Sequence, residues 1–353
     1  MKKIIALVLL GSLLFAGDII EMIPYQNSEF SPALKQKFPI EFELKKDAEV
    51  KIDIYTPDSN LIRSLHSKGV LKKGKHTMEW DGKDSNGTVV PDEAYNIVVK
   101  ADKEILDFRK TGGEIVKDLQ SHVNRQGHIS YKLSKPSRVL VRVGVENSSM
   151  LRVISNWIPK NRGKVLQRWS MRDKDNIVDI SKLKYGVSVS AFTLSDYAII
   201  TTNNKADNYI SYFQKNRFKC NTIPQDKQLL KRGDKGISKH FYGCRIKERD
   251  PRLELKIPNA KRDKNGLPIL SNGKRTLIKV SMNPEDEAIL EAVKYEVSFF
   301  VDFKFSSEEE LGYMPISWNF NPNGLKKGKH VLTVNVSSFS GQVGVKSLEF
   351  LIK

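Results

Sequence analysis

Apolar and polar residues alternate with a period of two along most of the chain. In residues 50–55, Val50, Ile52 and Ile54 alternate with polar neighbours, which predicts a strand with one buried face. Further strands are predicted at 61–65, 77–80 and 95–99, and turn residues separate them, including Pro57–Asn60, Asp81-Gly82 and Asn86-Gly87. The pattern predicts a small β-sandwich.

The same pattern recurs further along the chain. A shift of 89 residues carries the apolar positions of 40–54 onto those of 129–143, Gly74 onto Gly163 and Trp80 onto Trp169. After a slip of one residue, Tyr95 falls on Tyr185. A match of this length indicates a domain duplication rather than a short-period solenoid. We expect Trp80 and Trp169 to be the core anchors of the two copies.

A third region of alternating strands runs from 251 to 353. Its segment Leu325–His330 repeats Leu71–His76 letter for letter, and each hexapeptide precedes a predicted strand. We therefore predict a third, more diverged Ig-like sandwich. The fold class expected for the whole chain is all-β, with tandem Ig-like β-sandwiches.

Residues 40–101 resemble the Ig-like domain of the flagellar hook-capping protein, a FlgD-like Ig domain. The matching residues are 50–55, Gly74-Lys75-His76, Trp80-Asp81-Gly82-Lys83-Asp84-Ser85-Asn86-Gly87 and Ala94-Tyr95. The second copy keeps Trp169 but lacks the Asp-Gly turn, so its membership follows from the internal repeat. The resemblance implies a fold, and no flagellar role follows from it.

These patterns give the following organisation. We expect a signal peptide (1–16), an extended N-terminal arm (17–38), a FlgD-like Ig-like domain (39–102), a connector (103–127), a diverged second FlgD-like domain (128–201), a basic connector (202–250) and a C-terminal Ig-like sandwich (251–353).

The first sixteen residues predict export. Met1-Lys2-Lys3 is basic, and the apolar run that follows is shorter than the roughly 20 residues needed to span a bilayer. A Sec signal peptide cleaved after Ala16 is the favoured interpretation, and an uncleaved membrane anchor is the alternative. Cleavage would leave no stable membrane span and a periplasmic, extracellular or cell-surface protein. It would also remove two lysines from a formal net charge of +18.

The basic connector holds both cysteines, Cys220 and Cys244. In an exported chain, a disulfide between them is the first interpretation. Two free thiols, or metal ligation together with distant histidines, are the alternatives. No second pair of ligands at zinc-site spacing supports the metal alternative.

The sequence predicts no catalytic, cofactor-binding or metal site. Asp81, Asp84 and Asn86 evoke a calcium loop, but Gly82 stands where the first aspartate should be, so we favour a turn. Motifs for serine hydrolases, zinc proteases and phosphate-binding loops are absent. Trp157 and Trp318 have no counterpart in the repeat, and we expect burial rather than a sugar-stacking surface.

Three classes of function remain open. We favour a non-catalytic envelope or surface scaffold that binds a protein partner, with edge strands as one route. The second class is a module that binds anionic polysaccharide or another polyanion, which the basic charge would serve. The third is an enzyme whose site the sequence does not reveal. Specific nucleic-acid binding is not expected, because no basic and aromatic stacking groove is evident.

Overall fold

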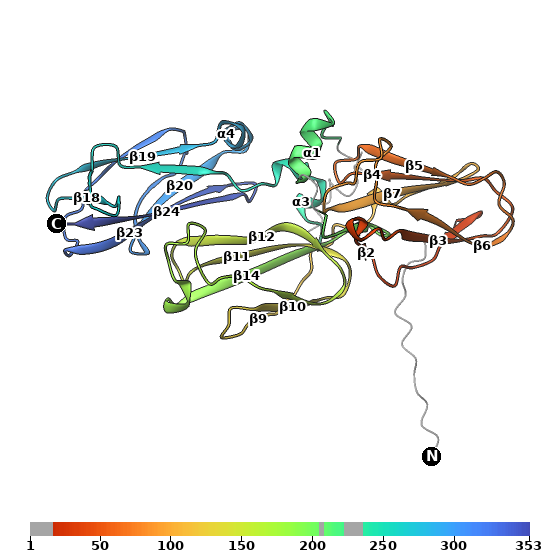
Figure 1. The fold of residues 1–353 in the computed structure, drawn as a ribbon, viewed down its shortest axis with the longest axis horizontal. Helices are drawn as coiled ribbons and strands as arrows, with labels where there is room; N and C mark the ends of the chain where they lie inside the picture. The colour runs from red at the N-terminus through yellow and green to blue at the C-terminus, as the bar shows by residue number, and fades with distance from the viewer. Residues whose placement is uncertain (1–16, 205–207, 222–235) are drawn as a thin grey trace, which may run out of the picture. The chain divides into compact units, whose positions relative to one another are not determined.

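The computed structural model describes residues 17–204, 208–221 and 236–353. The predicted signal peptide, residues 1–16, lies outside them. Strands dominate the described chain, which confirms the all-β class (Figure 1). The described residues form two compact units, unit 1 with residues up to Gly113 and Leu194–Ile237, and unit 2 with Glu114–Thr193 and Ser238–Lys353.

Unit 1 contains the first sandwich. One sheet has the order β1-β3-β6, and the other has the order β2-β15-β7-β4-β5, with β8 also pairing with β7. The strands are β1 (Ile20–Met22), β2 (Glu29–Phe30), β3 (Phe38–Leu44), β4 (Val50–Tyr55), β5 (Leu61–His66), β6 (Gly74–Trp80), β7 (Ala94–Ala101), β8 (Glu104–Asp107) and β15 (Ile199–Thr201).

The core of this sandwich follows from the alternation in its strands. In β3, every second residue from Phe38 to Leu44 is buried and the residues between them are exposed. Trp80 is fully buried and packs edge-on against Tyr95, with ring centroids 5.4 Å apart. The two apolar faces therefore close on each other, as the period of two requires.

Segments outside the predicted domain boundaries complete the first sandwich. Residues 17–38, which we expected to form an extended arm, contribute β1 to one sheet and β2 to the other. Strand β15 lies between β2 and β7, and helix α1 (Tyr209–Lys215) follows it, capped by Asn208. These strands have only two or three residues each, too few to show a period, which explains why the sequence pattern missed them.

The second sandwich lies in unit 2 and repeats the first. Its sheets have the orders β13-β10-β9 and β12-β11-β14. Leu44 pairs with Gly74 in the first sandwich, and Leu133 pairs with Gly163 in the second, as the 89-residue shift requires. The strands are β9 (Ser121–Val123), β10 (Ile129–Leu133), β11 (Ser137–Val145), β12 (Met150–Lys160), β13 (Gly163–Gln167) and β14 (Tyr185–Thr193).

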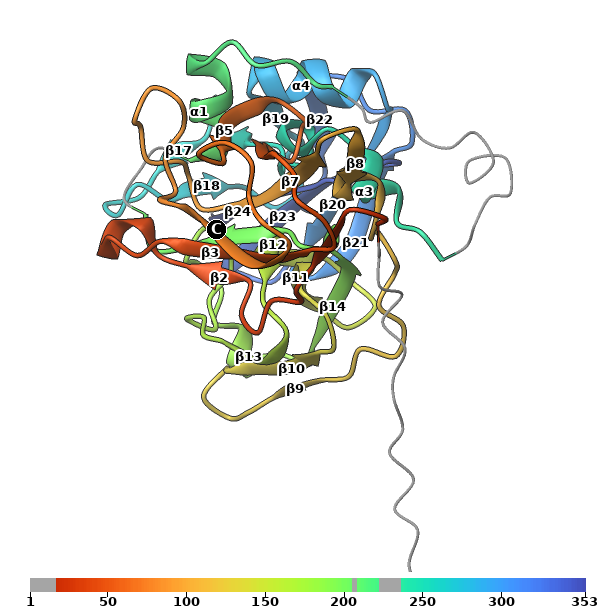
Figure 2. The ribbon, with the colours of Figure 1, turned by 90° about the vertical axis from the view of Figure 1, so that its right-hand side faces the viewer.

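The third sandwich completes unit 2. Its sheets have the orders β16-β19-β22 and β17-β18-β24-β23-β20-β21, and Figure 2 labels all of these strands except β16 from a second direction. The strands are β16 (Leu253–Lys256), β17 (Lys261–Arg262), β18 (Pro268–Leu270), β19 (Thr276–Met282), β20 (Tyr295–Val301), β21 (Lys304–Glu309), β22 (Ile316–Phe320), β23 (Gly328–Ser338) and β24 (Val343–Ile352).

The remaining helical elements are short. They are α3 (Lys239–Tyr242), α4 (Pro284–Glu291) and the 3-10 turns η1 (Pro32–Leu34), η2 (Phe108–Lys110), η3 (Ile180–Lys182) and η4 (Arg245–Lys247). Within the described residues, no helix has both the length and the apolar character needed to cross a bilayer.

The repeated hexapeptide has one local structure in both places. Gly74 and Gly328 have φ values of 130° and 131°, a region that favours glycine. The Nε2 atom of His76 lies 2.6 Å from the carbonyl oxygen of Lys72, and that of His330 lies 2.7 Å from the carbonyl oxygen of Lys326. The shared motif is therefore a strand lead-in with a structural role for its histidine.

Candidate protein-binding surface

Two neighbouring edge strands of the first sandwich carry the surface that we call the basic edge, residues 61–78. Strand β5 ends the larger sheet, and β6 ends the smaller one. Each strand therefore has one side on which no described strand pairs. An unpaired strand side presents backbone N–H and C=O groups to a partner.

The basic edge combines positive charge with exposed apolar side chains. Residues 61–78 include five lysines and arginines and no aspartate or glutamate. Leu61 and Val70 are 48% and 59% exposed, and Lys68, Lys73 and Lys75 are exposed beside them. This composition suits an acidic partner that also buries some apolar surface.

Only one lysine of the basic edge forms an ion pair with the described part of the chain. The ammonium group of Lys72 lies 2.8 Å from a carboxylate oxygen of Asp47. The hydrogen bond between them lowers the pKa of Asp47 and raises the pKa of Lys72. Because this pair is exposed, it contributes little to stability.

The sheet face behind β5 adds no net negative charge. Asp53 on β4 is buried, and its carboxylate lies 2.9 Å from Lys51 and 3.5 Å from Lys100. Burial opposes its ionisation, but the hydrogen bond from Ser64 and the two lysines lower the pKa of Asp53. The carboxylate is therefore outweighed locally by two positive charges.

The loop 81–87 is a hydrogen-bonded turn. Gly82 and Gly87 have positive φ values, as tight reversals require. Asp84 is buried, and its Oδ1 atom accepts hydrogen bonds from the backbone of Asn86 and Thr88 at 3.0 and 2.9 Å. Its other oxygen accepts the Tyr212 hydroxyl hydrogen bond at 2.9 Å. Both oxygens thus serve the turn interpretation rather than the calcium alternative.

Helix α1 is fixed to the same end of the first sandwich. Tyr209 donates a hydrogen bond of 2.8 Å to Asp58, and Tyr212 donates one to Asp84. Burial and these carboxylates raise the pKa of both tyrosines, so they stay protonated donors. Asn60 adds two backbone hydrogen bonds with Lys219.

Cys220 and Cys244 are disulfide-bonded, as the sequence predicts. Cys220 is exposed and Cys244 is buried. A disulfide sulfur is not a thiolate, so the free-thiol and metal-ligand alternatives do not apply in this state.

The tryptophans differ in their surroundings. Trp80 donates a hydrogen bond of 2.9 Å to the Lys83 carbonyl, whereas Trp169, expected to be the matching anchor, is only partly buried and its Nε1 atom has no described partner. Trp157 is 6% exposed. The partly buried Trp318 lies 4.5 Å from Phe299 and 4.8 Å from Phe320, measured between ring centroids. Neither Trp157 nor Trp318 is an open stacking surface.

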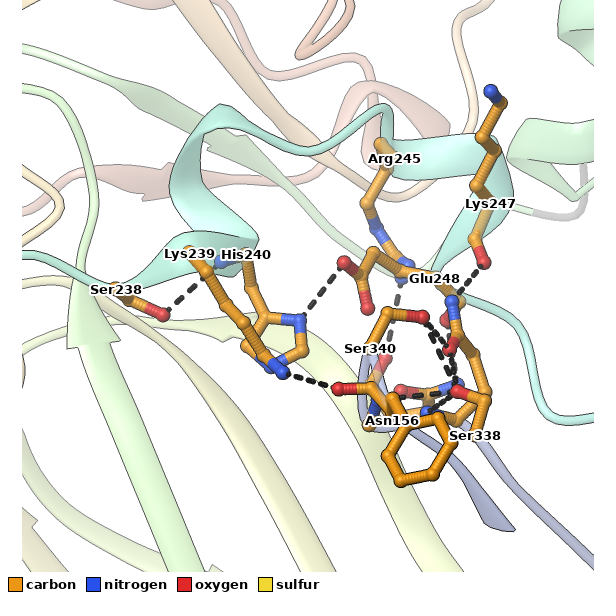
Figure 3. A network of polar contacts seen from close by, with 12 residues as sticks. Asn156, Ser238, Lys239, His240, Arg245, Lys247, Glu248, Ser338 and Ser340 are labelled. Atoms are coloured by element: carbon orange, nitrogen blue, oxygen red, sulfur yellow. Dashed lines mark hydrogen bonds and ion pairs between the residues drawn. The ribbon is translucent and has the colours of Figure 1, made fainter. Parts of the chain in front are cut away.

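In unit 2, the segment 238–250 connects the second and third sandwiches through a polar network that we call the junction (Figure 3). His240 on α3 lies 2.8 Å from the Glu248 carboxylate, measured from Nδ1. The backbone oxygen of Glu248 accepts a 2.6 Å hydrogen bond from Asn156 on β12. The Lys247 carbonyl accepts a bond of 3.0 Å from Gln342, in the turn between β23 and β24.

Direct contacts strengthen the junction. Asn335 on β23 forms hydrogen bonds of 2.8 and 2.9 Å with the backbone N–H and C=O groups of Met150. The Asp175 carboxylate binds Lys346 at 2.5 Å and the backbone of Ser347 at 2.7 Å. Several satisfied polar contacts of this kind fix the relative position of two surfaces.

An apolar cluster covers the outer face of the second sandwich at the junction. Leu140, Trp157 and Phe192 are buried there, and Phe241 of α3 packs against them. Trp157 also lies 4.4 Å from the His240 ring, measured between centroids. The outer face of this sheet is thus interior in unit 2.

A titrating carboxyl lies beside these contacts. Burial raises the pKa of Asp250 to about 6, although Arg142, Lys174 and Arg245 act in the opposite direction. Burial lowers the pKa of Arg142 and Lys174. The guanidinium group of Arg142 donates a hydrogen bond to the Gly341 carbonyl across the junction.

Comparison with known proteins identifies one part of the chain. Residues 28–104 match the model of the FlgD Ig-like domain family. Over 70 residues the chain is 39% identical to the basal-body rod modification protein FlgD of Salmonella typhimurium, and the same identity holds for the Salmonella typhi protein. The alignment covers 20% of this chain and 30% of each relative.

Solved structures give weaker matches. FlgD of P. aeruginosa matches with a TM-score of 0.21 and 21% identity, and the alignment covers 28% of this chain and 73% of the FlgD chain. A tetra-tandem repeat from the extending region of a large adhesion protein matches with a TM-score of 0.22 and 11% identity, and the alignment covers 96% of this chain and 74% of the adhesion protein chain. These scores are too low to bear on function.

Residues 28–104 therefore form a FlgD-like Ig domain. The match begins 11 residues before the predicted boundary at residue 39, because β2 belongs to the sheet. The chain spans less than a third of the length of these curated relatives, so the activity of the whole relatives is not transferred.

The sequence pattern did not reveal two features of the structure. The docking of α1 joins Tyr209 and Tyr212 to residues about 130–150 positions earlier, and only the three-residue tyrosine spacing hinted at a helix face. The junction uses single polar residues on different strands, which leave no periodic signal.

Proposed function

We propose that this chain is a non-catalytic scaffold or adaptor protein of the bacterial envelope, and that it binds a protein partner through the basic edge of its FlgD-type domain. The observation that carries the proposal is the outer side of β5, on which no described strand pairs and where Ser85 engages the Ile62 carbonyl, together with exposed Leu61, Val70 and lysines. Strand addition at such an edge supplies backbone hydrogen bonds, and the flanking side chains select the partner.

Two observations support export to the periplasm or the cell surface. The disulfide between Cys220 and Cys244 is stable in an oxidising compartment and rare in the cytosol. Residues 1–16 combine a basic start with an apolar run, a composition that is typical of a signal peptide.

A second candidate ligand is an anionic polysaccharide. The absence of any acidic residue between positions 61 and 78 favours it, since polyanion binding depends chiefly on charge. The two candidates differ in what they require. A polysaccharide needs the lysines, whereas strand addition also needs the unpaired backbone and Leu61.

The test is chemical crosslinking and affinity capture from the envelope fraction of the source organism, before and after protease treatment of that fraction. We expect the wild-type protein to capture a protein, and the variant Lys68→Glu/Lys73→Glu/Lys75→Glu to lose it. A matched control reverses three exposed lysines of the third sandwich, Lys261, Lys264 and Lys274. Equal capture by all three proteins would refute the role of the basic edge.

Protease treatment separates the two ligands. Capture that survives protease and collapses in moderate salt would replace the protein partner with a polysaccharide. A Leu61→Ser variant that retains full capture would argue in the same direction, because it removes the apolar contact but leaves the charge of the basic edge unchanged.

A further inference from the structure

The third sandwich has an exposed edge of a different character. Strand β21 ends the six-stranded sheet and pairs with β20 through a two-residue turn, Asp302-Phe303 (Figure 2). Both turn residues have positive φ, as a tight hairpin of this type requires. On its other side, β21 pairs with no strand in the described part of the chain.

The edge carries large apolar side chains. Phe305 on β21 is 60% exposed, and Leu311 and Tyr313, just after the strand, are 67% and 55% exposed. Phe305 packs edge-on against Phe300, with ring centroids 6.0 Å apart. Apolar side chains gathered on an open strand edge mark an interaction site or an aggregation hazard.

The pairing with β20 shows which side chains share a face. Lys304 lies opposite Val301 and Glu309 lies opposite Val297, and both valines point into the core. Phe305 and Glu308 lie opposite Phe300 and Ser298 on the outer face. The register shifts between Phe299 and Phe300, so Ser306 is an extra residue in β21.

This arrangement makes β21 its own complement. If two β21 strands pair antiparallel about a twofold axis between Ser306 and Ser307, Lys304 of each lies opposite Glu309 of the other. Phe305 of each then lies opposite Glu308. Residues directly opposite in a sheet share a face, and the extra Ser306 is what gives each of these pairs a common face.

We propose that β21 is a homodimerisation edge, which joins two molecules through antiparallel strand pairing and two Lys304–Glu309 ion pairs. The argument for a second copy as the partner is the charge complementarity within this one short strand. The net charge of +18 makes two copies of the chain repel each other elsewhere, so a self-complementary strand stands out. Isologous twofold contacts are the commonest form of homo-oligomer. This inference is independent of the proposed function of the basic edge.

The test is sedimentation equilibrium of the full chain over a range of concentrations. We expect a monomer–dimer equilibrium for the wild type. Lys304→Glu or Glu309→Lys alone should weaken it at least tenfold, because each places like charges opposite each other. The double variant Lys304→Glu/Glu309→Lys should restore it, since the complement is regained with the charges exchanged.

The control is the exchanged pair Lys329→Glu/Glu349→Lys on β23 and β24. This exposed ion pair, 3.6 Å long, lies in the same sheet away from its edge. It should leave dimerisation unchanged. A wild type that stays monomeric at high concentration would overturn the proposal. It would indicate that Lys304 and Glu309 instead protect the edge of β21 against strand pairing. A dimer that no β21 variant weakens, or a double variant that stays monomeric, would overturn it as well.

Discussion

At the scale of the residue, Trp80 and Trp169 show how equivalent positions diverge. The indole N–H of Trp80 is satisfied by the carbonyl of Lys83, in the turn that follows Asp81-Gly82. The second copy has Ser170-Met171 at the corresponding positions, and the indole N–H of Trp169 has no described acceptor. The turn itself is kept, because Asp173 accepts hydrogen bonds from the backbone N–H groups of Ile177 and Val178. The Arg172 carbonyl, which corresponds to that of Lys83, accepts a hydrogen bond from Arg152, and the indole lacks the polar partner that favours full burial of a tryptophan.

This difference predicts unequal effects of truncation. Trp80→Ala should destabilise the first sandwich by about 3–5 kcal/mol, the usual loss for a buried aromatic residue. Trp169→Ala should lower the stability of the second sandwich by less, because the side chain is only partly buried. Urea denaturation of both variants measures the difference, and an unchanged midpoint for Trp80→Ala would show that Trp80 is not essential to the core.

Asp250 predicts a pH dependence. Its carboxyl ionises near pH 4 in the unfolded chain and near a pKa of about 6 in the folded protein. The folded protein thus binds the additional proton between these values, so stability falls as pH rises from 4 to 6 and levels off above that. The component is at most about 3 kcal/mol.

The Asp250→Asn variant isolates this component. The difference in unfolding free energy between wild type and variant should change across pH 4–6 and be constant above pH 7. Thermal denaturation at a series of pH values measures it. A difference that is flat from pH 4 to 7 would contradict the raised pKa.

At the scale of the element, the loop 81–87 and helix α1 are held together by one residue, Asp84. Asp84 holds the turn through two backbone N–H groups and holds α1 through Tyr212. Asp81 lies in the same loop, but among the described residues it accepts one hydrogen bond, of 3.1 Å, from the Lys83 N–H on the exposed side. We therefore expect Asp84 to contribute more to the stability of the first sandwich than Asp81 does.

We expect Asp84→Ala to destabilise the first sandwich by roughly 2–3 kcal/mol, because it leaves buried donors without an acceptor. Tyr212→Phe should cost about 1 kcal/mol, and the control Asp81→Ala should stay within about 0.5 kcal/mol. Chemical denaturation with and without added calcium measures all three. Stabilisation of the wild type by calcium, lost in Asp81→Ala, would instead support a cation loop.

The elements show what the sequence could predict. Strands with clean alternation, such as β3, β4 and β20, were predicted because each buries one face. Strands β1, β2 and β15 have only two or three residues, too few to show a period, and their partners lie far away in sequence. The basic edge could be read as a charge pattern, but its position at a sheet edge required the strand order.

At the scale of the molecule, the junction makes the second and third sandwiches a single compact unit. Asn335 and Asp175 each supply two contacts across it. Side chains that pair across an interface in this way are invisible to sequence patterns, because they belong to different repeats and satisfy no local period. The disulfide, by contrast, could be predicted because the chain holds only two cysteines.

The junction predicts cooperative melting of unit 2. In wild type, the second and third sandwiches should unfold in one calorimetric transition. The double variant Asn335→Ala/Asp175→Ala should split it into two, since each change removes about 1–3 kcal/mol from the contact between them. Lys329→Ala, which breaks an exposed pair inside the third sandwich, is the control, and a single transition in the double variant would contradict a coupled unit.

The covered face of the second sandwich also shows how the two copies diverged after duplication. Under the repeat shifts, its Leu140, Trp157 and Phe192 correspond to Lys51, Lys68 and Asp102 of the first sandwich. After the duplication, the first copy kept charged residues on this face. The second copy has apolar residues at the same positions, where Phe241 of α3 packs against them. Selection on the two descendants has since been unequal, so homologues that lack the third sandwich should retain charged residues at those three sites.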